Sequence, residues 1–509
     1  MPTRSTTAAR AGGLVLTAAL LTGCFSPSAE DGAAAGSAGE DGSDGRISIA
    51  MLQPPRSGLS PLSDDAFKLS RWSTGETLVV LDEAGDAQPG LATAWEQVEP
   101  TTWRFEVRPD VTFHDGTALT PEDVVRSLTA AAEAVPPPRI LDGVDLTAEV
   151  DPGAPDSAVL VTTAEPDPLV PQRMSSPQLT VLAASAYADG VVDPVGTGTG
   201  PYELTVRDGT SGATLERYDD YWGETASAAG LDVTYVSDGT ARAAALRTGT
   251  ADVVEAIPVS QASLLEEDQI EEVPMPRTNT LYLNTETGVF ADPAVRAAAR
   301  EAIDRQTIVD TVYEGRADVA EGLLGPALPW AAQGRPDRTP TPAGTVPPGT
   351  PITLGTFTDR AELPEVAVQL EQQLEAAGFD VTQEVREYAQ IEADALSGAF
   401  DAFILSRATV LDSGDPVAYM YSDFACEGSF NISQLCDPEV DAALEEAAQT
   451  PPGEERRAAA LEAERLVLEA DAGIPMLHER VIQGESDRLA GAARDPRERA
   501  LVTSETSVG

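Results

Sequence analysis

The chain has 509 residues, and its 84 Asp and Glu residues outnumber 33 Lys and Arg residues, which gives a formal net charge of −51. This balance argues against nucleic-acid binding, because a phosphate backbone is held by clustered Lys and Arg. An apolar fraction of 42% fits a soluble globular protein. Three cysteines and two histidines argue against a disulfide-rich scaffold and leave little material for a His-rich metal site.

The N-terminus has the pattern of an export signal. Arg4 and Arg10 precede an apolar run at residues 14–21, which is much shorter than the about 20 residues that a membrane-spanning helix needs. The run ends in Leu-Thr-Gly-Cys, which resembles the lipobox of bacterial lipoproteins, where the cysteine carries the lipid. We therefore predict a signal peptide at 1–23, lipid attachment at Cys24 and a flexible tether at 24–45, where small and acidic residues predominate. An ordinary secretory signal with a chance cysteine is the alternative.

From residue 46 onward, strand-like runs alternate with helical patterns. The apolar runs that predict strands lie at residues 47–52, 77–81, 103–107, 159–163, 231–236, 280–283, 352–357 and 400–405. A Thr-Pro pair followed by acids predicts a helix from Pro121 to about Glu133. Apolar residues at helical spacing predict a helix over 363–377, which Gly378 ends, and another after Asp437. This succession predicts an α/β fold, with two lobes as its simplest arrangement.

The segment WRFEVRPDVTFHDGTALTPEDVVRSL at residues 103–128 closely resembles a hallmark of the family 5 solute-binding proteins, the dipeptide-, oligopeptide- and nickel-binding receptors of ABC importers. Most other matching pieces are weak singly, but they follow the order of the family. They lie at residues 76–95, 196–202 (GTGTGPY), 217–222, 248–253, 284–308, 430–444 and 473–475. The resemblance extends over about residues 46–495.

This resemblance implies the two-lobed type II periplasmic-binding-protein fold, in which a hinge closes the lobes over a ligand as a Venus flytrap does. Lobe I is expected to comprise residues 46–277 and 475–509, with an extra subdomain at 88–198, and lobe II residues 278–474. The chain is expected to cross between the lobes near Thr278–Asn284 and near Gly473–Val481.

The segment FDAFILSRATVLDSGDPVAYMY at residues 400–421 holds the main candidate for ligand binding. In the dipeptide- and oligopeptide-binding relatives, an aspartate four residues before the proline of this segment binds the α-ammonium group of the peptide. The resemblance therefore implies that role for Asp412. Charge-assisted hydrogen bonds of this kind contribute about 1.5–3 kcal/mol each. From the residue type alone, an Asx turn or a helix N-cap is the alternative for Asp412, and Asp415 is expected to be the turn or cap residue.

The backbone at Ala408 and Thr409 matches the segment that pairs with a peptide main chain as an added strand in these relatives. The sequence departs from the peptide receptors at two points. Thr409 stands where they carry Trp, and the helix over 363–378 lacks the Arg that is expected to hold a peptide carboxylate. Arg360, just before that helix, and Arg407, just before the strand end, are candidates to replace it. Dipeptides, longer peptides, a modified amine and a metal chelate therefore all stay open as ligands.

Cys426 and Cys436 lie at positions similar to a cysteine pair in the dipeptide-binding relatives. Thiols oxidise outside the cytoplasmic membrane, so we expect these two to form a disulfide.

The resemblance implies a binding protein without catalytic residues, cofactor or protein-bound metal, acting as a monomer on the outer face of the cytoplasmic membrane. Its expected partners are a small peptide or similar solute, the permease subunits of an ABC importer and, through the lipid, the membrane. Binding of a nickel or other metal chelate is one alternative, and a signalling or adhesion protein on the same fold is another. An extracellular hydrolase is a third, although the sequence contains no Gly-x-Ser-x-Gly or His-Glu-x-x-His motif.

Overall fold

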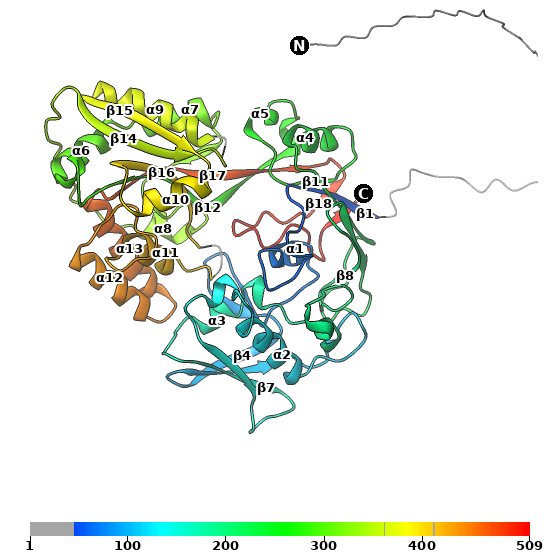
Figure 1. The fold of residues 1–509 in the computed structure, drawn as a ribbon. Helices are drawn as coiled ribbons and strands as arrows, with labels where there is room; N and C mark the ends of the chain where they lie inside the picture. Colours follow the sequence, from blue (N-terminus) through cyan, green and yellow to red (C-terminus); the bar gives the residue numbers. More distant parts are fainter. Residues whose placement is uncertain (1–44, 361, 411–412) are drawn as a thin grey trace, which may run out of the picture. The chain divides into compact units, whose positions relative to one another are not determined.

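A mixed sheet of eleven strands runs through the folded body (Figure 1). The computed structural model describes residues 45–360, 362–410 and 413–509. In spatial order the strands are β15 (Phe379–Arg386), β14 (Thr350–Phe357), β16 (Ala402–Ala408), β12 (Ile270–Leu283), β17 (Gly473–Glu485), β11 (Val253–Val254), β1 (Arg46–Met51), β10 (Gly230–Tyr235), β9 (Gly212–Arg217) and β8 (Tyr202–Asp208), and β13 (Ala317–Val319) pairs with β17.

The two long central strands, β12 and β17, join the two ends of this sheet. Residues 278–282 of β12 pair with residues 473–478 of β17, and this stretch of β12 also pairs with β16. Residues 270–274 of β12 pair with residues 480–484 of β17, and this end of β17 also pairs with β11. Between these stretches the register shifts. Pro274 and Pro276 lie at the shift and carry no N–H for the ladder, so the pairing is interrupted there. Both expected crossing points fall on these strands, while the boundaries of the lobes stay a prediction.

Buried apolar side chains form four clusters. The largest takes its members from residues 281–477, where β14 and β16 pack with the helices α9 (Glu362–Ala376), α12 (Pro438–Gln449) and α13 (Glu454–Glu469). A second cluster is confined to residues 78–183 and lies around a separate sheet of β4 (Ala92–Glu99), β5 (Thr102–Val107), β7 (Ala158–Thr163) and β6 (Leu146–Val150). The other two clusters surround β1 and the helix α4 (Gly239–Arg247). Separate cores of this kind allow parts of the body to move as units.

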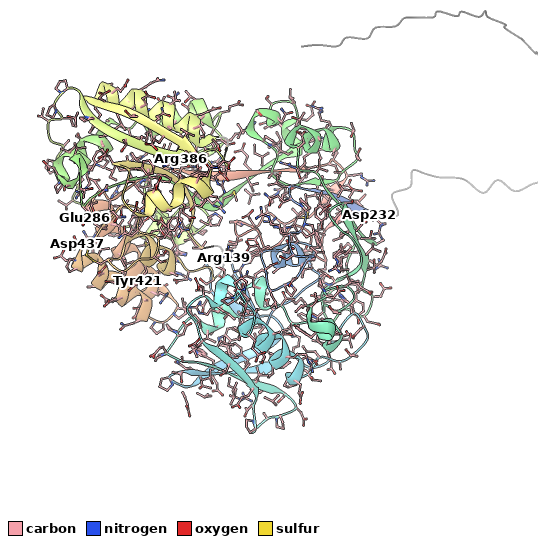
Figure 2. All side chains as sticks on the ribbon, in the orientation of Figure 1. Arg139, Asp232, Glu286, Arg386, Tyr421 and Asp437 are labelled. Carbon is pink, nitrogen blue, oxygen red and sulfur yellow. A yellow bond between two sulfur atoms is a disulfide. The ribbon has the colours of Figure 1, made fainter. Side chains whose placement is uncertain are left out.

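The secondary structure expected from the sequence is largely present. Each of the eight predicted strands overlaps a strand of the structure, with the 77–81 run shortened to β2 (Val79–Leu81). The helix α2 (Pro121–Ala132) begins with a capping box, in which the N–H and hydroxyl of Thr120 both donate to Asp123 Oδ2, at 3.0 and 2.7 Å. Asp437 caps α12 by accepting a hydrogen bond from the N–H of Glu439 (Figure 2). The α/β prediction is confirmed.

The predicted disulfide is also present. Cys426 and Cys436 are bonded within the loop that joins α11 (Val417–Phe424) to α12, and their Cα atoms lie 4.3 Å apart. Across the part of the chain that the structure describes, no helix is both long and apolar enough to cross a membrane.

Candidate functional site

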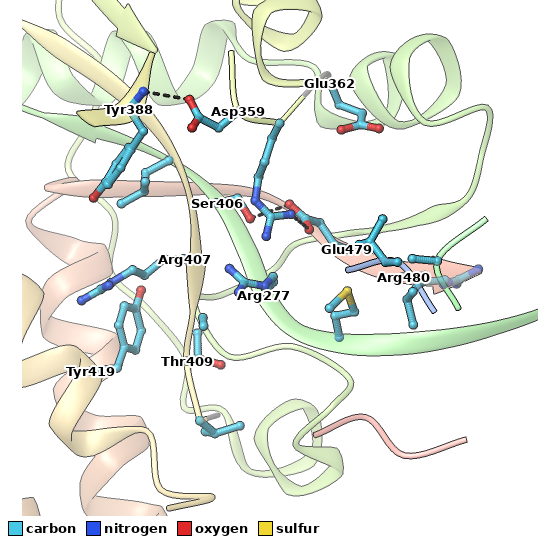
Figure 3. Close-up of a pocket in the computed structure, with 18 of the residues that line it drawn as sticks. Arg277, Asp359, Glu362, Tyr388, Ser406, Arg407, Thr409, Tyr419, Glu479 and Arg480 are labelled. Atoms are coloured by element: carbon cyan, nitrogen blue, oxygen red, sulfur yellow. Dashed lines mark hydrogen bonds and ion pairs between the residues drawn. The ribbon is translucent and has the colours of Figure 1, made fainter. Parts of the chain in front are cut away.

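A cavity of about 930 Å³ lies beside the middle of β12 and β17 and the C-terminal end of β16 (Figure 3). Its volume is in the range of sites that enclose small molecules, about 300–1,000 Å³. One side is lined by residues of β16, α11 and the segment before α9. The other side is lined by residues of the N-terminal part, among them Leu52, Gln53, Arg139 (Figure 2) and Pro258. Two parts of the chain that are far apart in sequence therefore face each other across this space.

The structure brings four of the predicted ligand-binding residues to this cavity. Arg360, Arg407, Ala408 and Thr409 all line it. Asp412 and Cys24 lie outside the described residues, so their predicted roles stay predictions. Asp415 behaves as expected of a turn residue: its Oδ1 accepts a hydrogen bond from the N–H of Val417 at 3.0 Å.

Arg407 is held by a buried carboxylate. Its Nε and Nη2 donate to Asp423 at 2.9 and 2.8 Å, the carboxylate is fully buried, and the hydroxyl of Tyr282 donates to it at 3.1 Å. The guanidinium lies 4.1 Å from the centre of the Phe430 ring. Burial opposes the charged guanidinium, but Asp423 outweighs it and raises the pKa of Arg407 above its ordinary value. Arg407 is thus tied to the protein on the cavity wall.

Arg360 is held by a second carboxylate. Its Nη1 donates to Oε2 of Glu479 on β17 at 2.8 Å, and Oε1 of the same carboxylate accepts from Ser406 at 2.5 Å and from Asn279 at 2.9 Å. These bonds join three strands and the segment before α9, which places Arg360 at the edge of the cavity.

Sequence reasoning missed a third arginine, Arg277 on β12. It lies opposite Ala408 in the pairing of β12 with β16 and lines the cavity. In Figure 3 it lies between β16 and Glu479. The one signal available in the sequence was its place directly before the expected crossing at Thr278, because a strand that crosses between lobes also borders the cleft between them.

Basic residues outnumber acidic ones around the cavity. Among the described lining residues the basic ones are Arg139, Arg242, Arg277, Arg360, Arg407 and Arg480, and the acidic ones are Asp359, Glu362, Asp415 and Glu479. In the whole chain the ratio is the reverse, 33 basic to 84 acidic residues. A cavity that gathers cations in so acidic a protein favours ligands with anionic groups. The described residues contain no group of three or more His, Cys, Asp and Glu side chains that could hold a metal ion.

Comparison with known proteins now identifies the family. Residues 86–431 match the model of the bacterial extracellular solute-binding proteins, family 5. The chain belongs to this family. The family 5 resemblance noted in the sequence is thereby confirmed.

Relatives of this family 5 protein include the glutathione-binding protein GsiB of Pectobacterium atrosepticum, which is 25% identical over 422 residues, 77% of this chain and 80% of that protein. Among solved structures, a nickel ABC transporter protein from Bacillus halodurans is 25% identical, with a TM-score of 0.79, and the match covers 91% of this chain and 100% of that one. A dipeptide-binding protein from Pseudoalteromonas sp. SM9913, in complex with Met-Leu, is 18% identical, with a TM-score of 0.70 and coverages of 91% and 100%. The type II periplasmic-binding-protein fold predicted for the chain is confirmed.

Proposed function

We propose that this family 5 protein captures peptides between two hinged lobes and delivers them, as a monomer, to the permease subunits of an ABC importer. It binds the peptide without making or breaking bonds. The observation that carries the proposal is a peptide-sized cavity that borders an open strand edge on β16. Relatives named for glutathione and dipeptide binding support the same ligand class.

The open edge follows from the hydrogen bonds of β16. The N–H of Thr409 donates to the carbonyl of Pro276 at 2.8 Å, so Thr409 faces β12. Backbone groups alternate along an antiparallel pair, which points the N–H and C=O of Ala408 toward the opposite edge. On that edge β14 pairs with β16 only at Ala402 and Phe403 among the described residues. A peptide main chain can therefore pair beside Ala408 as an added strand, whereas the backbone of Thr409 is already engaged.

The lobe arrangement proposed from the sequence fits this cavity. With lobe I at 46–277 and 475–509, and lobe II at 278–474, the cavity lies between the two lobes and is lined by both. Bending at the interrupted pairing of β12 and β17 would then open and close it. Such a closure gives the importer two shapes to distinguish, and ligand shifts the balance toward the closed one.

Asp412 is proposed to bind the α-ammonium group of the peptide. Its neighbours on either side along the described chain, Val410 and Ser413, both line the cavity. A mixed dipeptide library is expected to raise the melting temperature of the wild-type protein, because a ligand at 100 times its Kd stabilises the folded state by about 2.7 kcal/mol. N-acetylated dipeptides should give no such rise, since acetylation removes the positive charge.

The Asp412→Ala variant should lose the rise for free dipeptides, with affinity about 100-fold weaker. Asp359→Ala is the matched control, because Asp359 is another carboxylate on the same cavity. Equal stabilisation by free and acetylated dipeptides would show that no ammonium group is recognised. No stabilisation by any peptide would refute the peptide function itself.

We further propose that residues 1–23 are removed and that lipid on Cys24 holds the protein at the outer face of the cytoplasmic membrane. Two acyl chains on one cysteine supply the anchoring that a single chain does not. The wild-type protein is expected in the membrane fraction, and Cys24→Ser in the soluble extracytoplasmic fraction. Mass spectrometry should find a diacylated Cys24 as the first residue. An unmodified N-terminus at another residue would contradict the anchor.

A metal chelate is a second candidate ligand, favoured by the arginine-rich cavity and by the nickel transporter protein from Bacillus halodurans. Arginines hold the carboxylates of a chelator in bidentate pairs, without any protein ligand on the metal. Nickel with histidine or citrate, tested beside the dipeptides, distinguishes the two ligand classes.

A further inference from the structure

We infer that Arg277 is the residue that binds a carboxylate of the ligand, and that this protein therefore takes solutes that carry a free carboxylate beside their peptide-like main chain. The inference rests on the proposed function and adds to it the anchor for the acidic end of the ligand. It differs from the sequence-based expectation, which assigned that end to Arg360 or Arg407.

Within the described part of the chain, Arg277 is the cavity arginine that lacks an ion-pair or hydrogen-bond partner. Among the described residues, its half-buried guanidinium makes no ion pair and no hydrogen bond, whereas each of the other five cavity arginines has partners. Those partners are Asp64 for Arg139, backbone carbonyls of residues 236–256 for Arg242, Glu479 for Arg360, Asp423 for Arg407, and Glu272 and Asp318 for Arg480.

The local charge around Arg277 is unbalanced. The positive charge of Arg360 acts on Arg277 more strongly than any other charge does, and the carboxylate with the largest opposing effect, Glu479, is already bound by Arg360, Ser406 and Asn279. Burial, and then the repulsion from Arg360, lowers the pKa of Arg277, while Glu479 and, more weakly, Glu498 oppose the change. A guanidinium that loses water without gaining a counterion is costly. A ligand carboxylate would supply this counterion.

The strand register places Arg277 one strand away from the edge where a ligand main chain would lie. Arg277 and Ala408 are direct partners across β12 and β16, and they form a pair without mutual hydrogen bonds, in which side chains stand close together. The methyl group of Ala408 is too short to cover the guanidinium. A peptide paired beside Ala408 on the opposite edge of β16 lies one strand beyond Arg277. The long Arg277 side chain can extend over Ala408 toward such a peptide and form a planar, bidentate bond to its carboxylate.

This arrangement also links binding to closure. Closing the lobes would remove water from the cavity, and the cost of drying Arg277 would oppose closure while the site is empty. A carboxylate removes that cost, whereas a neutral amide of the same shape does not. Solutes with a free carboxylate should therefore favour the closed shape more than their amides do.

The test compares matched ligands on matched variants by thermal shift and calorimetry. The ligands are a mixed dipeptide library with free carboxyl ends and the same library as C-terminal amides. The variants are Arg277→Gln, Arg277→Lys and the control Arg247→Gln, which makes the same charge change at an exposed arginine in the last turn of α4. We expect the free acids to bind the wild-type protein and Arg247→Gln at least 10-fold more tightly than the amides.

Arg277→Gln should bind the free acids about 100-fold more weakly and lose the preference for acid over amide. Arg277→Lys should keep part of that preference, because it retains the charge but not the bidentate geometry. This variant also serves as the test if Arg277→Gln does not fold. Equal affinity of the wild-type protein for acids and amides, or an unchanged preference in Arg277→Gln or Arg277→Lys, would overturn the inference and leave the peptide function standing.

If no peptide binds the wild-type protein, the peptide function fails and a panel of non-peptide carboxylates decides the role of Arg277. Citrate, succinate and a nickel–histidine chelate are the probes. An anion anchor at Arg277 is supported if any of these probes binds the wild-type protein and Arg247→Gln but not Arg277→Gln. Arg277→Lys replaces Arg277→Gln in this comparison should the Gln variant not fold. If none of the probes binds in this pattern, the anchor role of Arg277 is overturned.

Discussion

Replacing Asp423 by alanine is expected to lower the free energy of unfolding by about 3–5 kcal/mol, because it leaves the charge of Arg407 without a counterion in a mostly buried place. Asp423 has no exposed side-chain surface, and Arg407 keeps 29% of its side chain exposed. The carboxylate also accepts the hydroxyl of Tyr282, which loses its partner in the same change. Urea unfolding of the wild type and the variant at pH 7 measures the difference.

The matched control is Asp219→Ala. Asp219 pairs with Arg217 at 2.8 Å, but the two side chains are 75% and 38% exposed. An exposed pair of this kind contributes at most about 1 kcal/mol. A loss in Asp423→Ala no larger than that in Asp219→Ala would contradict the structural importance of the buried pair.

A double replacement distinguishes the effect of the buried ion pair on stability from the effect of the volume that its two side chains fill. In Arg407→Met with Asp423→Leu, both charges are removed and apolar volume takes their place. Apolar replacements of buried ion pairs are often neutral or stabilising, so the double variant should recover much of the stability that Asp423→Ala loses. The loss in the single variant is then due to the stranded charge rather than to the missing volume.

Local patterns in the sequence predicted much of the secondary structure. The start of the helix α2 at Pro121, the helix α9 and the eight strand runs depend on neighbouring residues, and these patterns indicated them correctly. The full length of β12 did not emerge, because Pro274 and Pro276 break the strand pattern within it. Pro475 obscured the start of β17 in the same way.

The candidate site could be predicted only in part, because the contacts between its residues depend on the arrangement of distant strands rather than on local sequence. The resemblance located the segment around Arg407 and Ala408, which indeed lines the cavity. The partners of the arginines depend on which strands share the sheet. Glu479 is 119 residues from Arg360, and the two meet because β14, which ends just before Arg360, and β17 lie in one sheet with β16 and β12 between them. Nothing near Arg277 in the sequence distinguishes it from an arginine with a partner. Its isolation emerges only from the three-dimensional arrangement.

Acidification from pH 6.5 to pH 4 is expected to destabilise the fold through two buried histidines, by about 3 kcal/mol for each. Burial lowers the pKa of His114 to about 4, although a hydrogen bond to the carbonyl of Gly200 opposes the change. Burial, and then Arg335, lowers the pKa of His478 to about 4 as well. Above pH 6.5 both histidines are neutral in the folded and the unfolded chain, so they add no pH dependence there.

The sign of the effect follows from the protons bound in each state. Below pH 6.5 the unfolded chain takes up a proton on each histidine, while the folded chain stays neutral until about pH 4. Stability therefore falls as the pH falls through this window. Protonation of the 84 acidic side chains changes stability over part of the same window, so the histidine contribution has to be measured as a difference between variants.

The hydrogen bonds indicate which replacements keep the fold. His114 donates from Nε2 to the carbonyl of Gly200 at 2.9 Å, and a glutamine amide can donate from a similar place. The hydroxyl of Thr278 donates to the carbonyl of Leu323, so its oxygen must accept from Nδ1 of His478, which an asparagine amide imitates. Urea unfolding of His114→Gln with His478→Asn at pH 7, 6, 5 and 4 should show a smaller loss of stability than the wild-type protein shows. Parallel pH profiles for the two proteins would mean that both imidazoles take up protons as readily in the folded chain as in the unfolded one, so burial would not hold them neutral.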